Sequence, residues 1–244
     1  MSGIINMKEP QRRLSMPDFE PRTIEQVLLN RLSQSRFKEW VNHYSEPYKE
    51  LMSYYRCAIM EIETKFKVLS EEYSIQYDRN PIETIKTRLK TPESILDKMN
   101  RKGFPLTVDS IEQNISDIAG VRIICSFPSD TYMLADALLK QDDIRLIERK
   151  DYIANPKENG YRSLHLIVET PIFLHDHKRM MKVEVQFRTI SMDWWASAEH
   201  KIRYKKDVTV TDQMNRELAE CARIAAELDK RMETIQISVE ENRN

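Results

Sequence analysis

The sequence predicts an α+β fold in which a mixed β-sheet is flanked by helices, with a long helix toward each end of the chain. Apolar residues recur at three- and four-residue steps between Tyr48 and Tyr73, which is the spacing of an amphipathic helix. β-Branched and apolar runs fill the middle of the chain, and a heptad repeat follows near the C-terminus. With 244 residues, 41% of them apolar, the chain can bury one good core with helical appendages.

Residues 1–35 are expected to form a flexible extension, because they contain three prolines and scattered charges without a sustained period. A long helix follows, with a start signal at Ser45 and Pro47. It ends before Asn80, because a residue that precedes a proline avoids helical geometry. A shorter helix is predicted from Thr91 to Lys102 and is closed by a glycine.

Four strands are predicted in the middle of the chain from their composition, namely Val121–Phe127, Ile144–Ile153, Tyr161–Glu169 and Met180–Arg188. A helix over Asp130–Lys140 connects the first two strands, and a turn between the last two is marked by Pro171 and the stretch 175–177. Hydrophobic and polar residues alternate in the last strand, so Glu184 and Gln186 project from one face of the sheet. That face is either a solvated outer surface or the floor of a cleft.

The most regular pattern belongs to a helix within residues 208–244. Its apolar residues alternate steps of four and three and so form a heptad seam, which consists of Met214, Leu218, Cys221, Ala225, Leu228, Met232, Ile235 and Val239. The seam packs either on the helix's own domain or on another subunit, and we expect an oligomerisation helix here. The core domain is expected over residues 36–207 and includes the long first helix.

Composition limits the classes of function. The formal net charge is −1, so overall charge does not indicate bulk binding to DNA or RNA. Cys57, Cys125 and Cys221 lie far apart and form no CxxC pair, so each is expected to be a buried small hydrophobe in a reducing compartment. No apolar stretch approaches about 18 residues and no signal-peptide core is present. We therefore expect a cytoplasmic protein without a membrane span.

Three short clusters, at residues 117–122, 159–165 and 184–189, combine acidic or hydrogen-bonding groups with arginines at the edges of apolar runs. Three of the chain's four glycines lie in or near them. Asp117 and Glu184 could together hold Mg²⁺, which takes one or two carboxylates and completes its shell with water and substrate phosphates. Alternatively, both are ordinary surface carboxylates.

The same clusters suit a nucleotide. Tyr161, beside Gly160, could stack on a base, or it is an ordinary edge aromatic. Arg88, Lys90 and Arg122 could neutralise phosphates, or they form salt bridges. The sequence has no P-loop and no glycine-rich kinase loop, so a phosphotransferase of this sequence would bind ATP through its side chains.

In order and spacing, the clusters closely resemble the synthetase domain of the RelA/SpoT family of (p)ppGpp synthetases. The matching segments lie at residues 88–90, 94–98, 101–103, 117–122, 150–153, 157–165, 184–189 and 199–200. The resemblance covers roughly residues 47–240 and implies a nucleotidyltransferase-like sheet of about five strands. The length of the chain resembles that of a small alarmone synthetase, and residues 48–73 and 191–195 look more like the RelP branch than the RelQ branch.

The activity implied is transfer of the β,γ-pyrophosphate of ATP to the ribose 3′-hydroxyl of GDP or GTP. The family's long members also carry a hydrolase domain of the HD type. The five histidines here are too few and wrongly placed for one, so we expect synthesis without hydrolysis. Small synthetases are typically tetramers, and a homotetramer built through the terminal helices is therefore expected.

The resemblance also implies a role for each site residue. Asp117 and Glu184 would hold Mg²⁺, and Glu184 would also help to deprotonate the hydroxyl. On the ATP side, Arg88 and Arg122 would sandwich adenine, with Lys90, Lys98 and Arg101 on the phosphates. On the acceptor side, Tyr161 would stack on guanine and Asp193 would lie near the base, with Lys150, Lys157, His165 and Gln186 toward the ribose and phosphates.

The alternative is a catalytically silent nucleotide-sensing or RNA-binding oligomer on the same fold. The presence of both Asp117 and Glu184 speaks against it, because a pure binder has no use for a metal pair.

Overall fold

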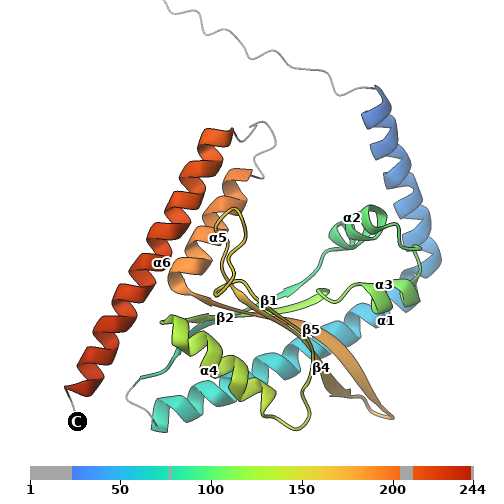
Figure 1. Cartoon of the computed structure of the whole chain (residues 1–244). Coiled ribbons are helices and arrows are strands. Elements are labelled where there is room, and N and C mark those ends of the chain that lie inside the picture. Colours follow the sequence, from blue (N-terminus) through green and yellow to red (C-terminus); the bar gives the residue numbers. More distant parts are fainter. Residues whose placement is uncertain (1–23, 77–78, 204–210, 243–244) are drawn as a thin grey trace, which may run out of the picture. The chain divides into compact units, whose positions relative to one another are not determined.

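The computed structural model describes residues 24–76, 79–203 and 211–242 of the chain, with side chains from residue 46 onward (Figure 1). The chain divides into two compact units between His43 and Tyr44, and the sheet, the site and the C-terminal helix belong to the second unit. Residues 1–23, which include most of the predicted N-terminal extension, lie outside the described residues.

Within the described residues, five strands form one sheet in the order β1-β2-β5-β4-β3. The strands are β1 (Ile82–Leu89), β2 (Ala119–Cys125), β3 (Arg145–Asp151), β4 (Leu164–Phe173) and β5 (Lys178–Thr189). β2 and β5 run parallel, and the other neighbouring strands run antiparallel. The predicted mixed five-stranded sheet flanked by helices is therefore confirmed.

The central strand β5 separates a packed face of the sheet from an open one. Val183, Val185 and Phe187 are fully buried, whereas Glu184 and Gln186, between them, are partly exposed. Because successive side chains of a strand point to opposite faces, this alternation assigns the apolar residues to one face. That face packs on helix α1 (Ile24–Gln76) and helix α4 (Pro128–Leu139), with the rings of Phe66 and Phe187 5.7 Å apart (Figure 1).

Three elements are not predicted from the sequence, namely β1, helix α3 (Val108–Asn114) and helix α5 (Ile190–Arg203). Strand β1 is an edge strand, and most of its residues are exposed, so it lacks the apolar content from which the other strands are predicted. Helix α3 has only seven residues, too few for a recognisable helical period. Helix α2 (Pro92–Lys102) confirms its prediction, with Thr91 accepting from the Ser94 N–H and Gly103 ending the helix in left-handed geometry (φ 68°).

Helix α1 begins at Ile24 and passes through Pro47, so the predicted start at Ser45 is wrong. The residues ahead of Ser45 include good helix formers and apolar residues at helical spacing, such as Phe37, Trp40, Val41 and Tyr44. The helical pattern therefore continues on both sides of the proline.

The predicted turn between the last two strands is found at residues 174–177, where the Leu174 N–H donates to the His177 carbonyl. Pro171 does not belong to it, because it lies inside β4 opposite Met180. Beyond Glu169, β4 pairs with β5 alone, so a residue without an N–H is tolerated on the unpaired side.

The C-terminal helix α6 (Asp212–Glu241) packs beside α5 (Figure 1). The contact face lies mainly beside the heptad seam and shares Leu218 with it. Leu228 of the seam is 54% exposed, whereas its neighbour Asp229 is only 8% exposed. Five further seam residues are also exposed, namely Met214, Cys221, Met232, Ile235 and Val239. Leu218 and Ala225 are half-buried, and Leu218 packs on the cluster of Trp195, Ala196 and Ala222. Six of the eight seam residues are therefore left exposed by the described part of the chain.

The cysteines follow this arrangement. Cys125 is buried in β2 as predicted, and Cys57 is half-buried in α1. Cys221 is exposed because it belongs to the seam, so its predicted burial is wrong. In the described residues, no helix is long and apolar enough to cross a membrane.

Candidate active site

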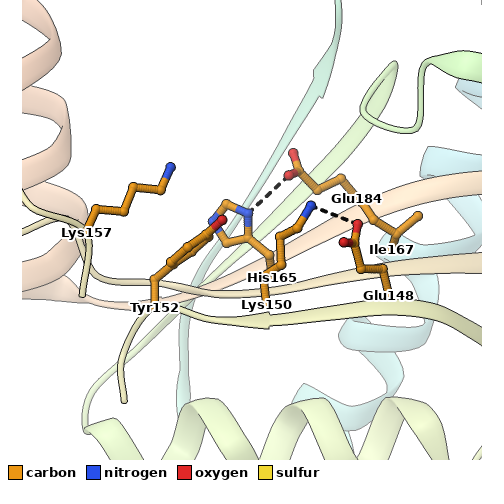
Figure 2. Close-up of a pocket in the computed structure, with 7 residues that line it drawn as sticks. All are labelled: Glu148, Lys150, Tyr152, Lys157, His165, Ile167 and Glu184. Carbon is orange, nitrogen blue, oxygen red and sulfur yellow. Dashed lines mark hydrogen bonds and ion pairs between the residues drawn. The ribbon is translucent and has the colours of Figure 1, made fainter. Parts of the chain in front are cut away.

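Glu184 stands at the middle of the open face of the sheet, where two cavities meet. It lies on β5, between Gly120 of β2 and Ile167 of β4. One cavity, of about 210 Å³, lies over β3 and β4 and is lined by Glu148, Lys150, Tyr152, Lys157, His165, Ile167 and Glu184 (Figure 2). The other, of about 250 Å³, lies over β1 and β2 and is lined by Lys86, Thr87, Arg88, Gly120, Val121, Arg122, Glu184 and Gln186. We refer to them as the β3–β4 cavity and the β1–β2 cavity.

The Glu184 carboxylate is held from both sides. His165 Nδ1 lies 3.2 Å from Glu184 Oε1, and Gln186 Nε2 donates to Oε2 at 2.9 Å. Burial raises the pKa of Glu184, but the hydrogen bond and charge of His165 outweigh it, so the pKa lies below its usual value. The negative charge of Asp117 raises the pKa of Glu184, which means that the two carboxylates repel each other. Glu184 is therefore ionised at neutral pH.

Asp117 lies just before β2 and is bound by two lysines. Lys98 Nζ donates to Asp117 Oδ1 at 2.8 Å, and Lys90 Nζ donates to Oδ2 at 3.0 Å. Burial alone would raise the pKa of Asp117, but the hydrogen bonds and charges of Lys98 and Lys90 leave it below its usual value. A second anionic carboxylate thus lies near enough to Glu184 for its charge to act on it.

The donor set at this point suits a hard divalent cation. Two ionised carboxylates supply oxygen ligands, which Mg²⁺ prefers, and one or two of them suffice because phosphate and water complete the shell. Among the described residues, no group of three or more His, Cys, Asp or Glu forms a self-sufficient metal cage. The carboxylate pair fits a Mg²⁺ ion that binds together with a phosphate ligand.

Aromatic rings and cations gather at and beside the β3–β4 cavity. The Tyr161 hydroxyl hydrogen-bonds His165 Nε2 at 2.8 Å and accepts from Arg188 Nη2 at 2.7 Å. Lys157 Nζ lies 4.6 Å from the centroid of the Tyr152 ring and 4.8 Å from that of Tyr161. Figure 2 shows the Lys150 ammonium group directed at Glu148 and the His165 ring directed at Glu184. This side offers planar surfaces and positive charge together, as a base and its phosphates require.

Asp193 has a different environment from the other candidates. The residue is only 6% exposed. Its carboxylate accepts hydrogen bonds from Lys86 Nζ at 2.7 Å, Arg122 Nη1 at 3.0 Å and Arg188 Nη1 at 3.1 Å. Burial raises the pKa of Asp193, but the hydrogen bond of Lys86 and the charges of the arginines lower it below its usual value. Asp193 lines neither cavity. It holds Lys86 and Arg122, which line the β1–β2 cavity, together with Arg188, which donates to Tyr161.

The comparisons with known proteins agree with the motifs. Residues 87–209 match the region found in RelA/SpoT proteins. The GTP pyrophosphokinase YwaC of Bacillus subtilis (strain 168) is 48% identical over 187 residues, which cover 77% of this chain and 89% of that protein. This chain belongs to the RelA/SpoT family.

Solved structures of this family share the fold. The small alarmone synthetase 2 of Bacillus subtilis superposes with a TM-score of 0.72 at 46% identity, over 79% of this chain and 100% of that one. The small alarmone synthetase 1 of the same organism, bound to its product pppGpp, gives a TM-score of 0.73 at 34% identity, over 80% of this chain and 98% of that one.

The predicted site residues of this RelA/SpoT chain fall into three groups. Arg88, Arg122 and Gln186 line the β1–β2 cavity, and Lys150, Lys157 and His165 line the β3–β4 cavity, with Tyr161 bonded to His165. Lys90 and Lys98 bind Asp117. Arg101, exposed at the end of α2, lines neither cavity.

Three residues of the site are missed by the sequence analysis. Tyr152 lines the β3–β4 cavity, and its position two residues after Lys150 could have indicated a shared face. Lys86 lies on the unpredicted strand β1, two residues before Arg88, and the same rule applies once the strand is known. Arg188 is buried in the last strand, where only the surrounding tertiary structure reveals its bonds to Tyr161 and Asp193.

Proposed function

We propose that this chain is a GTP pyrophosphokinase that transfers the β,γ-pyrophosphate of ATP to the ribose 3′-hydroxyl of GDP or GTP, which yields ppGpp or pppGpp. The observation that carries the proposal is the position of Glu184, a buried and ionised carboxylate that lines both the β1–β2 cavity and the β3–β4 cavity. A reaction between two nucleotides requires such a group where their binding sites meet. The relatives named GTP pyrophosphokinase support the same reaction.

The β1–β2 cavity is the proposed ATP site. Arg88 and Arg122 line it, and guanidinium groups stack on bases as well as pairing with phosphates. Lys90 and Lys98 lie beside it on Asp117 and would move their charge to the transferred phosphates. Arg101 would join them there from α2.

The β3–β4 cavity is the proposed acceptor site. Tyr161 would stack on guanine, and Lys150 and Lys157 would neutralise the 5′-phosphates. His165 and Gln186 hold Glu184 in place and lie toward the ribose. Asp193 would recognise guanine only after giving up the Lys86 hydrogen bond, which is the most exposed of its three.

In the proposed reaction, the acceptor 3′-oxygen attacks the β-phosphorus of ATP in line with the bond to the leaving α-phosphate oxygen. A bond forms between the 3′-oxygen and the β-phosphorus, the bond to AMP breaks, and the hydroxyl proton passes to Glu184. Asp117 and Glu184 would hold a Mg²⁺ ion, which would neutralise the charge of the phosphates when bound.

The chain's assignment to the RelP branch, its location in the cytoplasm and its assembly into a homotetramer belong to the same proposal. The exposed seam of α6 supports assembly, because six apolar or sulfur side chains remain in contact with solvent in the single chain.

A single incubation tests the function. The purified protein, given ATP, GDP and Mg²⁺, is expected to form ppGpp and AMP in equal amounts, measured by anion-exchange chromatography. Omission of GDP serves as the control, since simple ATP hydrolysis would continue without it. A folded protein that binds both nucleotides and forms no product would favour the catalytically silent alternative.

A further inference from the structure

Helix α6 contacts the rest of its domain through a stripe of residues displaced by about one position from the exposed seam. One residue corresponds to about 100° around a helix, so the two stripes occupy different faces. Trp195 Nε1 donates to the Leu218 carbonyl at 2.9 Å, and Ala222 is buried against Trp195 and Ala196. Further along, the Ser129 N–H of α4 donates to Glu233 at 2.7 Å.

Asp229 makes the most buried polar contact of this stripe. Its Oδ2 accepts from Thr189 Oγ1 and from Ser191 Oγ, each at 2.6 Å. Thr189 Oγ1 in turn accepts from the Met192 N–H at 3.1 Å and so caps the first turn of α5. Asp229 thereby fixes the corner at which β5 ends and α5 begins.

This corner carries groups of the site on both sides. Arg188, which immediately precedes Thr189, donates to the Tyr161 hydroxyl and to Asp193. Asp193 lies in the first turn of α5. A displacement of the corner therefore displaces the arginine that orients Tyr161.

A second contact of α6 reaches the same tyrosine from its own loop. A Cβ atom at Gly160 would lie only 2.5 Å from the Ala222 Cβ, so the loop that carries Tyr161 rests directly on α6. Ala222 and Asp229 are seven residues apart on one face of α6. One helix face thus touches both elements that hold Tyr161.

We propose that helix α6 positions the acceptor side of the active site, and that Asp229 is the positioning residue through which it holds the β5–α5 corner. Asp229 lines neither cavity and acts through Thr189, Ser191 and Arg188. The inference rests on the proposed function, because it assigns the β3–β4 side to the guanine nucleotide.

No residue of α6 lines the β1–β2 cavity. Within the described part of the chain, the corner reaches that cavity only through Asp193, which holds Lys86 and Arg122, and through the bond from Arg188 to Gln186. A smaller effect is therefore expected on the ATP side.

The test compares three variants in steady-state kinetics, with ATP and GDP varied separately. Asp229→Ala is expected to raise the KM for GDP about tenfold, because a small misplacement of a binding group is costly, and to leave the KM for ATP within about twofold. Asp229→Asn keeps an oxygen that accepts from both hydroxyls and should keep the KM for GDP within about threefold of the wild type. Glu233→Ala is the matched control, since it removes an α6 hydrogen bond to α4, and both KM values should stay unchanged.

Each outcome decides the proposal. An Asp229→Ala protein with an unchanged KM for GDP, or with equal increases in both KM values, would overturn it, since a general loosening of the fold affects both substrates. If that variant does not fold, Ser191→Ala removes one of the two donors and should raise the KM for GDP alone by about threefold. If the wild type makes no product, the proposed function fails, and calorimetric titration of the same variants with GDP then measures the positioning effect directly.

Discussion

At the scale of single residues, Glu184 must stay charged although it is largely buried. Its pKa stays low because His165 and Gln186 supply hydrogen bonds from the neighbouring strand and from two residues along β5. A sheet holds these three groups more rigidly than a loop would. The base proposed for the reaction is thus ready before either nucleotide binds.

Glu184→Gln tests that role. The variant keeps the shape of the side chain and removes its charge, so kcat should fall by about 10²–10⁴, as for loss of a general base. The melting temperature should change little, because Glu184 makes no apolar core contact. Quenched time courses and thermal melts measure the two effects. A variant within threefold of wild-type kcat would refute the role of Glu184.

Asp193→Ala should remove the shared partner of Lys86, Arg122 and Arg188. The buried Arg188 charge would be left without its carboxylate, and we expect the activity with GDP to fall by about one to three orders of magnitude. Comparing kcat/KM for GDP and for ADP measures recognition of guanine. Unchanged efficiency and unchanged discrimination against ADP would exclude both a structural and a recognition role.

Asp229 predicts an unusual dependence of stability on pH. Burial raises its pKa most, with a further increase from Glu233, and the hydrogen bonds of Ser191 and Thr189 and the charge of Arg162 only partly offset this. A carboxyl whose folded pKa is raised stabilises the fold at low pH, and that contribution is lost as the pH rises through the folded pKa.

Asp229→Asn has no such loss, so its melting temperature should match the wild type near pH 4.5 and exceed it near pH 7.5. Differential scanning at the two pH values measures the gap. A gap that narrows as the pH rises would contradict the raised pKa.

At the scale of elements, the loop before Tyr161 packs closely on helix α6 because Gly160 has no side chain at the contact. Gly160 has a φ of +86° and faces Ala222, whereas Gly103 has a φ of +68° and nothing within 4 Å of a Cβ. Both glycines occupy left-handed geometry, which other residues adopt at a cost of about 1 kcal/mol. Of the two, only Gly160 has no room for the methyl group of an alanine, because Ala222 occupies that space.

Gly160→Ala should therefore destabilise the protein by more than Gly103→Ala, by about 1–3 kcal/mol of additional overpacking energy. Combining it with Ala222→Gly should recover most of this difference, because the clash needs both methyl groups. Chemical denaturation of the single and double variants measures the coupling. Equal destabilisation at the two glycines would show that α6 does not press on this loop.

The elements that the sequence predicts are those with a strong period or a strong composition. β2, β5, α4 and α6 meet that condition, and each is found close to its predicted bounds. β1 fails it, because an exposed edge strand carries little apolar signal. The first half of α1 is missed for another reason, because Pro47 is interpreted as a start signal although it lies inside the helix. For the site, the clusters indicate Asp117 and Glu184, but the bonds of Arg188 and Asp193 depend on long-range packing that no local pattern contains.

At the scale of the whole molecule, the two faces of α6 have separate tasks. One face is used within the chain, and the seam on the other remains exposed. Leu228→Glu should abolish the proposed homotetramer, since an unpaired charge buried in a seam costs several kcal/mol, about 2–5 by analogy with other buried unpaired charges. Multi-angle light scattering measures the mass. A monomeric wild-type protein would refute the proposed tetramer. An intact tetramer in the variant would show that the interface lies outside the seam.

The order of strands in the sheet also has a consequence for synthesis of the chain. β5 is the last strand to be made, yet it is inserted between β2 and β4, and the bond from Arg122 to Gln186 spans 64 residues. Glu184 of that strand lines both cavities. A nascent chain that has completed β1 to β4 therefore has neither of the proposed nucleotide sites, and slow long-range closure must precede any turnover. Premature release or truncation before residue 178 leaves no partially active fragment.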